Sequence, residues 1–518
     1  MTTTDRSPLV LGIDASTTAC KAVVWDLRGE PAAEGRAALP LRRPRPLWHE
    51  QPAEAWWEAL VAAVRAAVGD DPAIAARIAA LCIAPQRETF VPVDDAGAPL
   101  RPAIVWMDER CRALLPRIER EYGGARIHRE TGKPLSGNLS LGKILWLREQ
   151  EPEVFARTAR YLDVAAFLNH RLTGAYRTGW GCAGPTGLFD LEHGSWDVPL
   201  LSYLGVRVGQ MPEAFPPGAL VGRITADAAD ACALPVGLPV VAGIGDGQAG
   251  GLGAGVVRRG QAYLNLGTAV ISGVFSGHML TDTAFRTMVG GVPGTYSLET
   301  VILGGTYTVT WFLETLAARE AGETIEHALA RFDAGLDGTP PGAAGLLAVP
   351  YWNSAMSPYW DADASGIVAG WRGTHTLHHL YRAILEGIAF EQRLNTEGVE
   401  AALGQAIEGY VAMGGGARSD RWCQIVTDVT GKPLRRAATM EAAALGAGIL
   451  AAAGAGLFGE VRDAAAAMAR VDPQIFEPDS RRHAFYSRQY REVYRQLFPA
   501  LQSHLQCLAN LTFDGGEL

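Results

Sequence analysis

Two stretches of the sequence, about 250 residues apart, share one local pattern. An apolar run at residues 9–13 leads into a polar turn at residues 14–18, and a second apolar run follows at residues 22–25. The same order returns at residues 261–275, around the turn at residues 267–269. So long a spacing excludes a solenoid of short repeats. It predicts instead a duplicated α/β domain in which each half opens with an antiparallel hairpin.

Composition supports two large cores and excludes two classes of partner. Of the 518 residues, 48% are hydrophobic and 19% are charged, and the formal net charge is −9. An acidic surface gives no electrostatic basis for binding nucleic acid or an anionic membrane. The uncharged segment at residues 442–459 is mostly Ala and Gly, so it predicts a buried interdomain helix rather than a membrane span.

The domain division and the compartment follow from similar evidence. We expect an N-terminal domain at residues 1–258 and a C-terminal domain at residues 259–518. The seven cysteines lie far apart without a CxxC pair, which predicts neither a disulfide framework nor a structural zinc site. Residues 1–8 lack the apolar core of a signal peptide. Together these features predict a cytoplasmic protein.

The first polar turn is a candidate phosphate site. Its sequence, Asp-Ala-Ser-Thr-Thr, offers hydroxyls and backbone N–H groups to an anion. Lys21 lies close enough in sequence to balance the charge of that anion. Asp14 would suit a phosphate-bound Mg²⁺, directly or through water. The alternative is an ordinary hairpin turn in which Asp14 is a local cap.

A second candidate is the carboxylate of Asp246, between a predicted strand and a helix of small residues. The segment contains GxGxxG at Gly245, Gly247 and Gly250, a pattern typical of dinucleotide sites. Asp246 would repel a pyrophosphate there, and no acidic residue for a ribose follows about 20 residues later. A carboxylate at a helix N-terminus suits the acceptance of a proton from a substrate hydroxyl. The alternative is a helix N-cap.

A glycine-rich turn at residues 414–418 follows an apolar run and precedes a predicted helix at residues 422–430. Three consecutive glycines let a flat ligand lie against the backbone, and the helix start supplies N–H groups for an anion. These features indicate a nucleotide site. The alternative is a turn without a ligand.

The segment Gln86-Arg-Glu-Thr89 follows a predicted buried strand at residues 78–84. Arg87 can donate and Glu88 can accept hydrogen bonds from the hydroxyls of a polyol. Trp106, expected at the end of a strand at residues 103–106, would cover the C–H face of such a ligand. The alternative is a surface ion pair and a core tryptophan.

These segments, in this order, resemble the FGGY carbohydrate kinases, the family that includes xylulokinase and glycerol kinase, over nearly the whole chain. The matching segments are Gly12-Ile-Asp-Ala-Ser-Thr-Thr18, Pro46-Leu-Trp-His-Glu-Gln51 with Trp56-Trp57, Ala103-Ile-Val-Trp-Met-Asp108, Gly245-Asp-Gly-Gln248, Leu266-Gly-Thr268, Gly366-Ile-Val-Ala-Gly370 with Arg382-Ala-Ile-Leu-Glu386, and Gly414-Gly-Gly-Ala-Arg418. The resemblance implies a duplicated actin-like (ribonuclease H-like) fold with ATP and a sugar meeting in a central cleft.

The resemblance, together with the turns above, assigns roles by position. Asp246 is expected to be the catalytic base, and Asp14 and Asp246 are expected to associate with Mg²⁺. The expected substrate-binding residues are Gln86, Arg87, Glu88, Trp106, Asn138, Asp246 and Gln248. The expected ATP-binding residues are Thr17, Thr18, Lys21, Gly267, Thr268, Thr310, Gly415, Gly416, Ala417 and Asp420.

The substrate stays open at this point between a pentulose such as xylulose and a glycerol- or tetritol-like polyol. Residues 86–89 and 357–361 resemble glycerol kinase, whereas residues 46–51 and 414–418 resemble xylulokinase. Gly247 separates Asp246 from Gln248, where glycerol kinase has the two side by side. Asn138 also departs from the first family signature, which the chain matches later at Lys143–Trp146.

The expected reaction is ATP- and Mg²⁺-dependent phosphorylation of a primary hydroxyl on a small sugar or polyol. A homodimer is a possible assembly. The alternative function is a non-catalytic or chaperone-like actin-fold ATPase that binds nucleotide and a protein partner.

Overall fold

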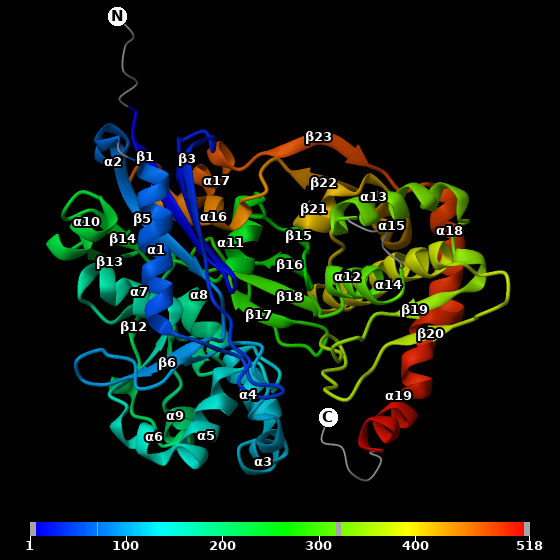
Figure 1. Ribbon diagram of the computed structural model, residues 1–518, viewed down its shortest axis with the longest axis horizontal. Coiled ribbons are helices and arrows are strands. Elements are labelled where there is room, and N and C mark those ends of the chain that lie inside the picture. The colour runs from blue at the N-terminus through cyan, green and yellow to red at the C-terminus, as the bar shows by residue number, and fades with distance from the viewer. Residues whose placement is uncertain (1–6, 70, 318–322, 512–518) are drawn as a thin grey trace, which may run out of the picture.

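The computed structural model describes residues 7–69, 71–317 and 323–511, and it forms two lobes around two large mixed β-sheets (Figure 1). The first sheet consists, in spatial order, of β13 (Leu220–Arg223), β14 (Pro239–Val241), β5 (Ile78–Pro85), β1 (Leu9–Ala15), β2 (Ala19–Trp25) and β3 (Pro31–Ala38). The second consists of β17 (Arg286–Val289), β18 (Tyr296–Ile302), β16 (Val270–Ser276), β15 (Gln261–Leu266), β21 (Gly409–Met413), β22 (Leu434–Ala437) and β23 (Val471–Phe476). The prediction that residues 1–8 are not a signal peptide falls mostly on residues 1–6, outside the described ranges.

The two sheets repeat one pairing pattern. In the first, β3, β2 and β1 pair antiparallel, β5 and β14 continue in parallel, and β13 pairs antiparallel at the edge. In the second, β18, β16 and β15 pair antiparallel, β21 and β22 continue in parallel, and β23 pairs antiparallel at the edge. Strand β17 extends the second sheet beyond β18. The repeated order confirms the duplicated α/β fold expected from the two hairpins.

Helices and smaller sheets surround the first large sheet. The helices near it are α1 (Ala53–Val68), α2 (Pro72–Arg77), α7 (Val164–Thr173), α8 (Trp180–Ala183), α10 (Ala226–Cys232) and α11 (Asp246–Gly253). A four-stranded sheet of β4 (Glu50–Gln51), β7 (Ala103–Ile104), β6 (Phe90–Val93) and β8 (Arg160–Asp163) lies below them in Figure 1. Beside it lie α3 (Leu115–Glu121), α4 (Gly124–Thr131), α5 (Ser140–Gln150), α6 (Pro152–Arg157) and α9 (Val198–Leu204), with the strand pairs β9 (Arg177–Gly179) and β12 (Glu213–Phe215), and β10 (Phe189–Asp190) and β11 (Ser195–Trp196).

The second lobe packs its helices around its own sheet. They are α12 (Thr306–Thr315), α13 (Ile325–Gly335), α14 (Leu377–Leu403), α15 (Asp420–Thr430), α18 (Ser480–Gln489) and α19 (Arg495–Asn510), with the strand pair β19 (Leu347–Val349) and β20 (Ile367–Ala369). The long helix α14 buries side chains such as Leu385, Ile388 and Phe390 in the core of this lobe.

The helices and strands predicted near the site are present, with one correction. Strand β5 and both opening hairpins occupy the predicted segments, and α15 covers the predicted helix at residues 422–430. The strand predicted at residues 103–106 ends at Ile104, because the N–H of Asp108 donates to the carbonyl of Val105 (3.0 Å) and closes a turn. Trp106 therefore lies in a turn rather than at a strand end.

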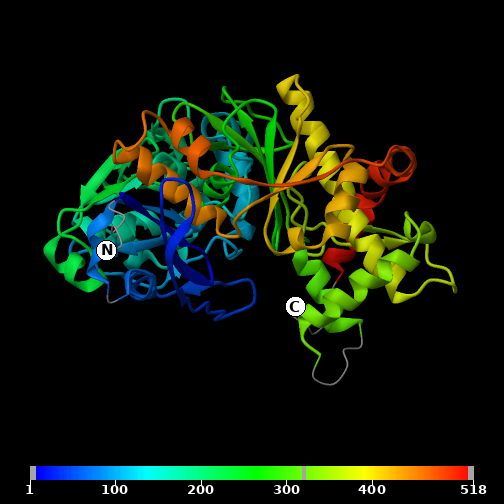
Figure 2. The same ribbon diagram turned by 90° about the horizontal axis from the view of Figure 1, so that it is seen from above.

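Helix α16 (Ala442–Gly454) comes from the second half of the sequence but packs on the first sheet. It contacts β1 and β5 on one side and α11 on another, and α17 (Val461–Met468) lies beside it. Both ribbon views place α16 and α17 in the first lobe, with β23 returning to the second (Figures 1 and 2). A buried interdomain helix was expected here and is confirmed. No helix among the described residues is both long and apolar enough to cross a bilayer.

Small residues allow this close packing. A Cβ atom at Gly12 of β1 would lie 1.9 Å from the carbonyl oxygen of Ala444. A Cβ atom at Gly446 would lie equally close, 1.9 Å, to the carbonyl oxygen of Ala249 in α11. Backbone therefore packs directly on backbone where the two halves of the chain meet, and a methyl group there would have to displace a helix.

Replacing Gly446 with Ala is expected to lower the free energy of unfolding by about 1–3 kcal/mol, because the added methyl overpacks the contact between α16 and α11. Alanine would otherwise favour a helix by about 1 kcal/mol over glycine. Urea unfolding followed by circular dichroism measures the change. Gly338→Ala is the matched control, since a Cβ atom there meets nothing within 4 Å. Equal effects of the two substitutions would contradict the packing argument.

Candidate functional site

A cavity of about 310 Å³ lies at the junction of the two lobes. The β1–β2 turn of the first lobe and the β15–β16 turn of the second both reach it, as do the end of β21 and the start of α16. The repeated hairpins therefore face one another across a shared space. The predicted site residues that line it are Asp14, Thr17, Lys21, Arg87, Glu88, Trp106, Asn138 and Asp246.

Asp14 is a buried carboxylate near the end of β1, next to Lys21 in the antiparallel register. Its Oδ1 atom has no hydrogen-bond partner among the described residues. Burial, and then the nearby charge of Asp246, raise the pKa of Asp14 to about 7. A buried, unpartnered acceptor that faces a cavity is suited to a ligand that carries positive charge.

Asp246 is the first residue of α11, and Gly245 before it is the N-cap residue. The reading of Asp246 as the N-cap is therefore wrong. Its Oδ1 atom accepts a hydrogen bond from the N–H of Gly247 (2.8 Å) and lies 3.3 Å from Nε of Arg87. Burial raises the pKa of Asp246 above its ordinary value, while the guanidinium of Arg87 opposes this shift. The carboxylate is 34% exposed, and this exposed part faces the cavity.

The two aspartates fit a divalent cation that brings other ligands with it. The two carboxylates make the electrostatic potential of the cavity more negative, and Oδ1 of Asp14 has no hydrogen-bond partner among the described residues. No group of three or more His, Cys, Asp or Glu side chains among the described residues could hold a metal by itself. Mg²⁺ commonly binds one or two carboxylates and completes its coordination with phosphate oxygens and water. Asp14 and Asp246 match that donor set.

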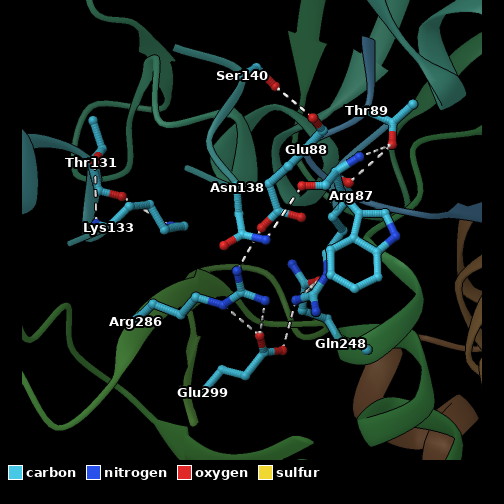
Figure 3. Close-up of polar contacts among 12 residues, drawn as sticks. Arg87, Glu88, Thr89, Thr131, Lys133, Asn138, Ser140, Gln248, Arg286 and Glu299 are labelled. Atoms are coloured by element: carbon cyan, nitrogen blue, oxygen red, sulfur yellow. Dashed lines mark hydrogen bonds and ion pairs between the residues drawn. The ribbon is translucent and has the colours of Figure 1, made fainter. Parts of the chain in front are cut away.

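A network of buried charged side chains forms one wall of the cavity (Figure 3). Nη1 of Arg87 and Nη2 of Arg286 each lie 2.7 Å from Glu299, one on each carboxylate oxygen. Nη1 of Arg286 lies 2.7 Å from Glu88. The exposed fractions of Arg87, Glu88, Arg286 and Glu299 are 5%, 4%, 8% and 0%. These ion pairs join the first lobe to strands β17 and β18 of the second.

The adjacent residues Arg87 and Glu88 pair with different partners. The backbone of Glu88 has a φ of 55°, in the left-handed region that non-glycine residues rarely adopt. Its carbonyl accepts a hydrogen bond from Oγ of Ser140 (3.1 Å), which helps to hold this conformation. Such strain is concentrated at functional sites. The alternative of a surface ion pair at these positions is wrong, because both side chains are buried and pair across the lobes.

Trp106 closes another side of the cavity. Its indole N–H donates to Oγ1 of Thr17 (2.9 Å), and its backbone N–H donates to Oγ1 of Thr89 (3.0 Å). The side-chain amide of Asn138 donates to the carbonyl of Trp106 (3.4 Å). The alternative of a core tryptophan is wrong, because the half-buried ring of Trp106 lines the cavity. Oγ1 of Thr17, expected at a phosphate, is thus also bound to this wall.

Lys143 and Gln86 support this wall from behind. Nζ of Lys143 is fully buried and donates to the carbonyls of Val105 (2.9 Å), Trp106 (2.9 Å) and Asn138 (2.8 Å). Nε2 of Gln86 donates to Oε1 of Gln51 (2.8 Å). Gln86 therefore lies one layer behind the cavity surface.

Lys21 lines the cavity, but its ammonium group has a partner. Nζ of Lys21 lies 2.7 Å from Oε2 of Glu441, at the start of α16. Gln248 does not line the cavity, and its Oε1 accepts a hydrogen bond from Nη1 of Arg87 (3.3 Å), which does.

The predicted nucleotide residues of the second lobe lie around the cavity rather than in its surface. The carbonyls of Gly267 and Thr268 accept hydrogen bonds from Thr306 (2.9 Å) and Tyr307 (3.1 Å) at the start of α12. Gly414 lines the cavity with a φ of 84°, and a Cβ atom there would lie 2.3 Å from Oδ1 of Asn265. The other residues expected to bind ATP, including Thr18 of the first lobe, do not line the cavity: Thr18, Thr310, Gly415, Gly416, Ala417 and Asp420.

Three charged residues of the site were not expected from the sequence. Arg286 lines the cavity, Glu299 joins the two arginines, and Glu441 pairs with Lys21. None lies in a motif, and each has a partner in the first lobe that is between 198 and 420 residues away in the chain. Only the side-by-side arrangement of the two sheets reveals them.

Comparisons with known proteins agree with this geometry. Models of the FGGY family of carbohydrate kinases match residues 9–253 for the N-terminal domain and residues 262–455 for the C-terminal domain. Xylulose kinase of Staphylococcus epidermidis is 29% identical over 496 residues, 95% of this chain and 96% of its own. Glycerol kinase of Dechloromonas aromatica is 30% identical over 510 residues, 95% of this chain and 98% of its own. The crystal structure of xylulose kinase from Rhodospirillum rubrum matches with a TM-score of 0.86 at 29% identity, covering 96% of this chain and 99% of that one.

Replacing Asp14 with Asn is expected to stabilise the metal-free protein. The folded chain keeps a proton on Asp14 up to about pH 7, whereas an ordinary aspartate releases it near its usual pKa of 3.8. Ionisation therefore favours the unfolded chain increasingly as the pH rises between these values. The gain in the free energy of unfolding should reach at most about 4 kcal/mol at about pH 8 and about half of that at about pH 5.5. Urea unfolding in a chelating buffer measures the free energy of unfolding at both pH values. A gain that shrinks with rising pH would contradict the argument.

Proposed function

Because this chain belongs to the FGGY family of carbohydrate kinases and is an ATP-dependent phosphotransferase, we propose that it phosphorylates a primary hydroxyl of a small sugar or polyol. The observation that carries this proposal is the position of Asp246. Its carboxylate faces the cavity at a helix N-terminus, beside the buried Arg87–Glu88 wall, and Asp14 lines the same cavity. A proton acceptor, a wall of hydrogen-bonding groups and a cation site thus share one space.

Asp246 is the proposed general base. It would accept the proton of the acceptor hydroxyl as that oxygen attacks the γ-phosphorus of ATP in line. The guanidinium of Arg87, 3.3 Å away, opposes the effect of burial on the pKa of Asp246 and so favours the carboxylate form needed to accept a proton. The backbone N–H of Gly247 orients the carboxylate. Most of the remaining rate enhancement comes from positioning and charge stabilisation.

Mg²⁺ is proposed to bind near Asp14 and Asp246, where it would offset the negative charge of the transferring phosphoryl group. Hydroxyl and N–H groups of the turns at Thr17, Thr18, Gly267 and Thr268 would bind phosphate oxygens. The glycine-rich loop at Gly415, Gly416 and Ala417 would lie against the adenosine, with Asp420 and Thr310 nearby on the same lobe. Lys21 is proposed to act at the phosphates as well, in competition with Glu441.

The proposed acceptor is a pentulose such as xylulose or a glycerol- or tetritol-like polyol. Relatives named xylulose kinase and glycerol kinase cover nearly the whole chain at almost equal identity, so they support both classes. Arg87, Glu88 and Asn138 would bind acceptor hydroxyls, and the ring of Trp106 would cover the C–H face. Gln86 and Gln248 would hold this wall in place.

The test is the release of ADP from Mg·ATP across a panel of polyols and ketoses, with Asp246→Asn beside the wild type. We expect one acceptor to raise ADP release, and Asp246→Asn to lower that rate about 10²–10⁴-fold while ATP still binds. Asp95→Asn, an exposed carboxylate, is the matched control. ATP binding without any acceptor-dependent turnover would overturn the proposal and favour the alternative of an ATPase that binds a protein partner.

Removing Mg²⁺ with a chelator is expected to abolish turnover, and excess Mg²⁺ should restore it. Asp14→Asn should raise the Mg²⁺ concentration needed for half-maximal rate about 10–100-fold, because one carboxylate that holds the ion is lost. Titration of the rate with Mg²⁺ at saturating ATP measures the shift. An unchanged Mg²⁺ requirement in Asp14→Asn would assign the metal to other groups.

A further inference from the structure

Residues 351–363 of the second lobe, here called the strap, lie between β19 and β20 and have no part in the proposed function. Met356 of the strap nevertheless lines the cavity. Ser354 and Trp360 have φ values of 69° and 51°, in the left-handed region that such residues rarely adopt. Backbone strain of this kind persists only where the surrounding contacts hold it. The strap is therefore a segment whose position its neighbours determine.

Helix α19 holds the strap from one side. Asp361 of the strap is buried, and its Oδ2 atom accepts hydrogen bonds from the side-chain amides of Gln502 (2.8 Å) and Gln506 (2.9 Å). At the other end of the strap, the ring of Tyr351 packs edge-on against Phe498, with the ring centroids 4.7 Å apart. These contacts fasten the strap to the second lobe, so that it moves with that lobe.

A guanidinium of the first lobe reaches the strap from the other side. Nη2 of Arg112 lies 2.5 Å from Oδ1 of Asp363 and also donates to the carbonyl of Ala362 (2.8 Å). Nη1 of Arg112 lies 3.3 Å from Oε2 of Glu109, which orients the guanidinium within its own lobe. Arg112 and Asp363 are 37% and 44% exposed. An ion pair this exposed adds little to the stability of the whole chain, so its effect is local.

This ion pair joins two walls of the cavity at the protein surface. Trp106, a few residues before Arg112, lines the cavity from the first lobe, and Met356, a few residues before Asp363, lines it from the second. The distance between these walls therefore depends on contacts between the lobes. Inside the protein the ion pairs of Glu299 provide such contacts, and at the surface Arg112 and Asp363 provide another.

We propose that Arg112 and Asp363 form a clamp that holds the strap against the Trp106 wall and so retains the acceptor in the cavity. Both are positioning residues, because neither lines the cavity and each acts through its own wall. The inference rests on the proposed function and adds the residues that set the width of the acceptor site. Loss of the clamp lets the strap move away from Trp106, which weakens acceptor binding and leaves Asp246 in place.

The first test is the KM for the acceptor in variants of the clamp. Arg112→Gln and Asp363→Asn should each raise this KM about two- to fivefold, with kcat and the KM for ATP within about twofold of the wild type. The double variant should be no worse than either single variant, because both substitutions remove the same interaction. Arg112→Asp should raise the KM most, since it brings two carboxylates together, and adding Asp363→Arg should reverse that increase.

Arg177→Gln is the matched control. The guanidinium of Arg177 is also 37% exposed, and it binds one carboxylate (Glu213, 3.0 Å) and one carbonyl (Val221, 3.1 Å), but all three residues belong to the first lobe. The control should leave the KM for the acceptor unchanged. Added salt screens an exposed ion pair, so at saturating ATP it should weaken acceptor binding in the wild type and not in Arg112→Gln.

Hydrogen exchange followed by mass spectrometry tests the clamp without turnover. The amides of residues 351–363 should exchange faster in Arg112→Gln than in the wild type, and at the wild-type rate in Arg177→Gln. If the wild type phosphorylates no acceptor, the proposed function fails, and the exchange rates alone decide whether the clamp exists. Unchanged exchange in Arg112→Gln would overturn the inference. So would an unchanged KM for a phosphorylated acceptor, additive effects in the double variant, or no rescue of Arg112→Asp by Asp363→Arg.

Discussion

The buried carboxylate of Glu299 is the interaction on which the site depends most. Two guanidinium groups come within 2.7 Å of it, one from each lobe, in a region almost closed to water. Without that carboxylate, the two buried arginines would repel one another, and only Asp246 and Glu88 would remain to offset their lost hydration. Because Arg87 comes from the first lobe while Arg286 and Glu299 come from the second, the same ion pairs fix how the lobes face each other and shape the cavity between them.

Close backbone packing provides the second constraint. Helix α16 approaches β1 and α11 at Gly12 and Gly446, where no side chain fits. This contact carries Glu441 to the ammonium group of Lys21 in the hairpin of the first lobe. The interdomain helix thus delivers a charge to the cavity as well as closing the core, so packing and electrostatics at the junction are not independent.

The sequence predicted most features that have a local signal. The hairpins, the strand before Gln86 and the turn before α11 follow from runs of apolar residues ended by small or polar ones, and the family and enzyme class followed from their order. Trp106 was placed at a strand end, but a turn closed by Asp108 stops β7 two residues earlier. Arg286 and Glu299 carry no signal, because ion pairs between distant segments leave no local pattern. The sequence showed Arg87 and Glu88 as neighbours and could not show that each pairs across the lobes.

Arg87 links the chemistry of the site to its choice of acceptor. One edge of its guanidinium faces the proposed base, Asp246, and another faces the buried carboxylate of Glu299. Its side chain packs so tightly on the catalytic turn that a Cβ atom at Gly245 would lie 2.3 Å from it. Any change that moves this guanidinium toward a substrate must also move it relative to the base. The other walls offer acceptor contacts that do not involve this guanidinium, because Asn138 and Trp106 are held through backbone carbonyls bound by Lys143.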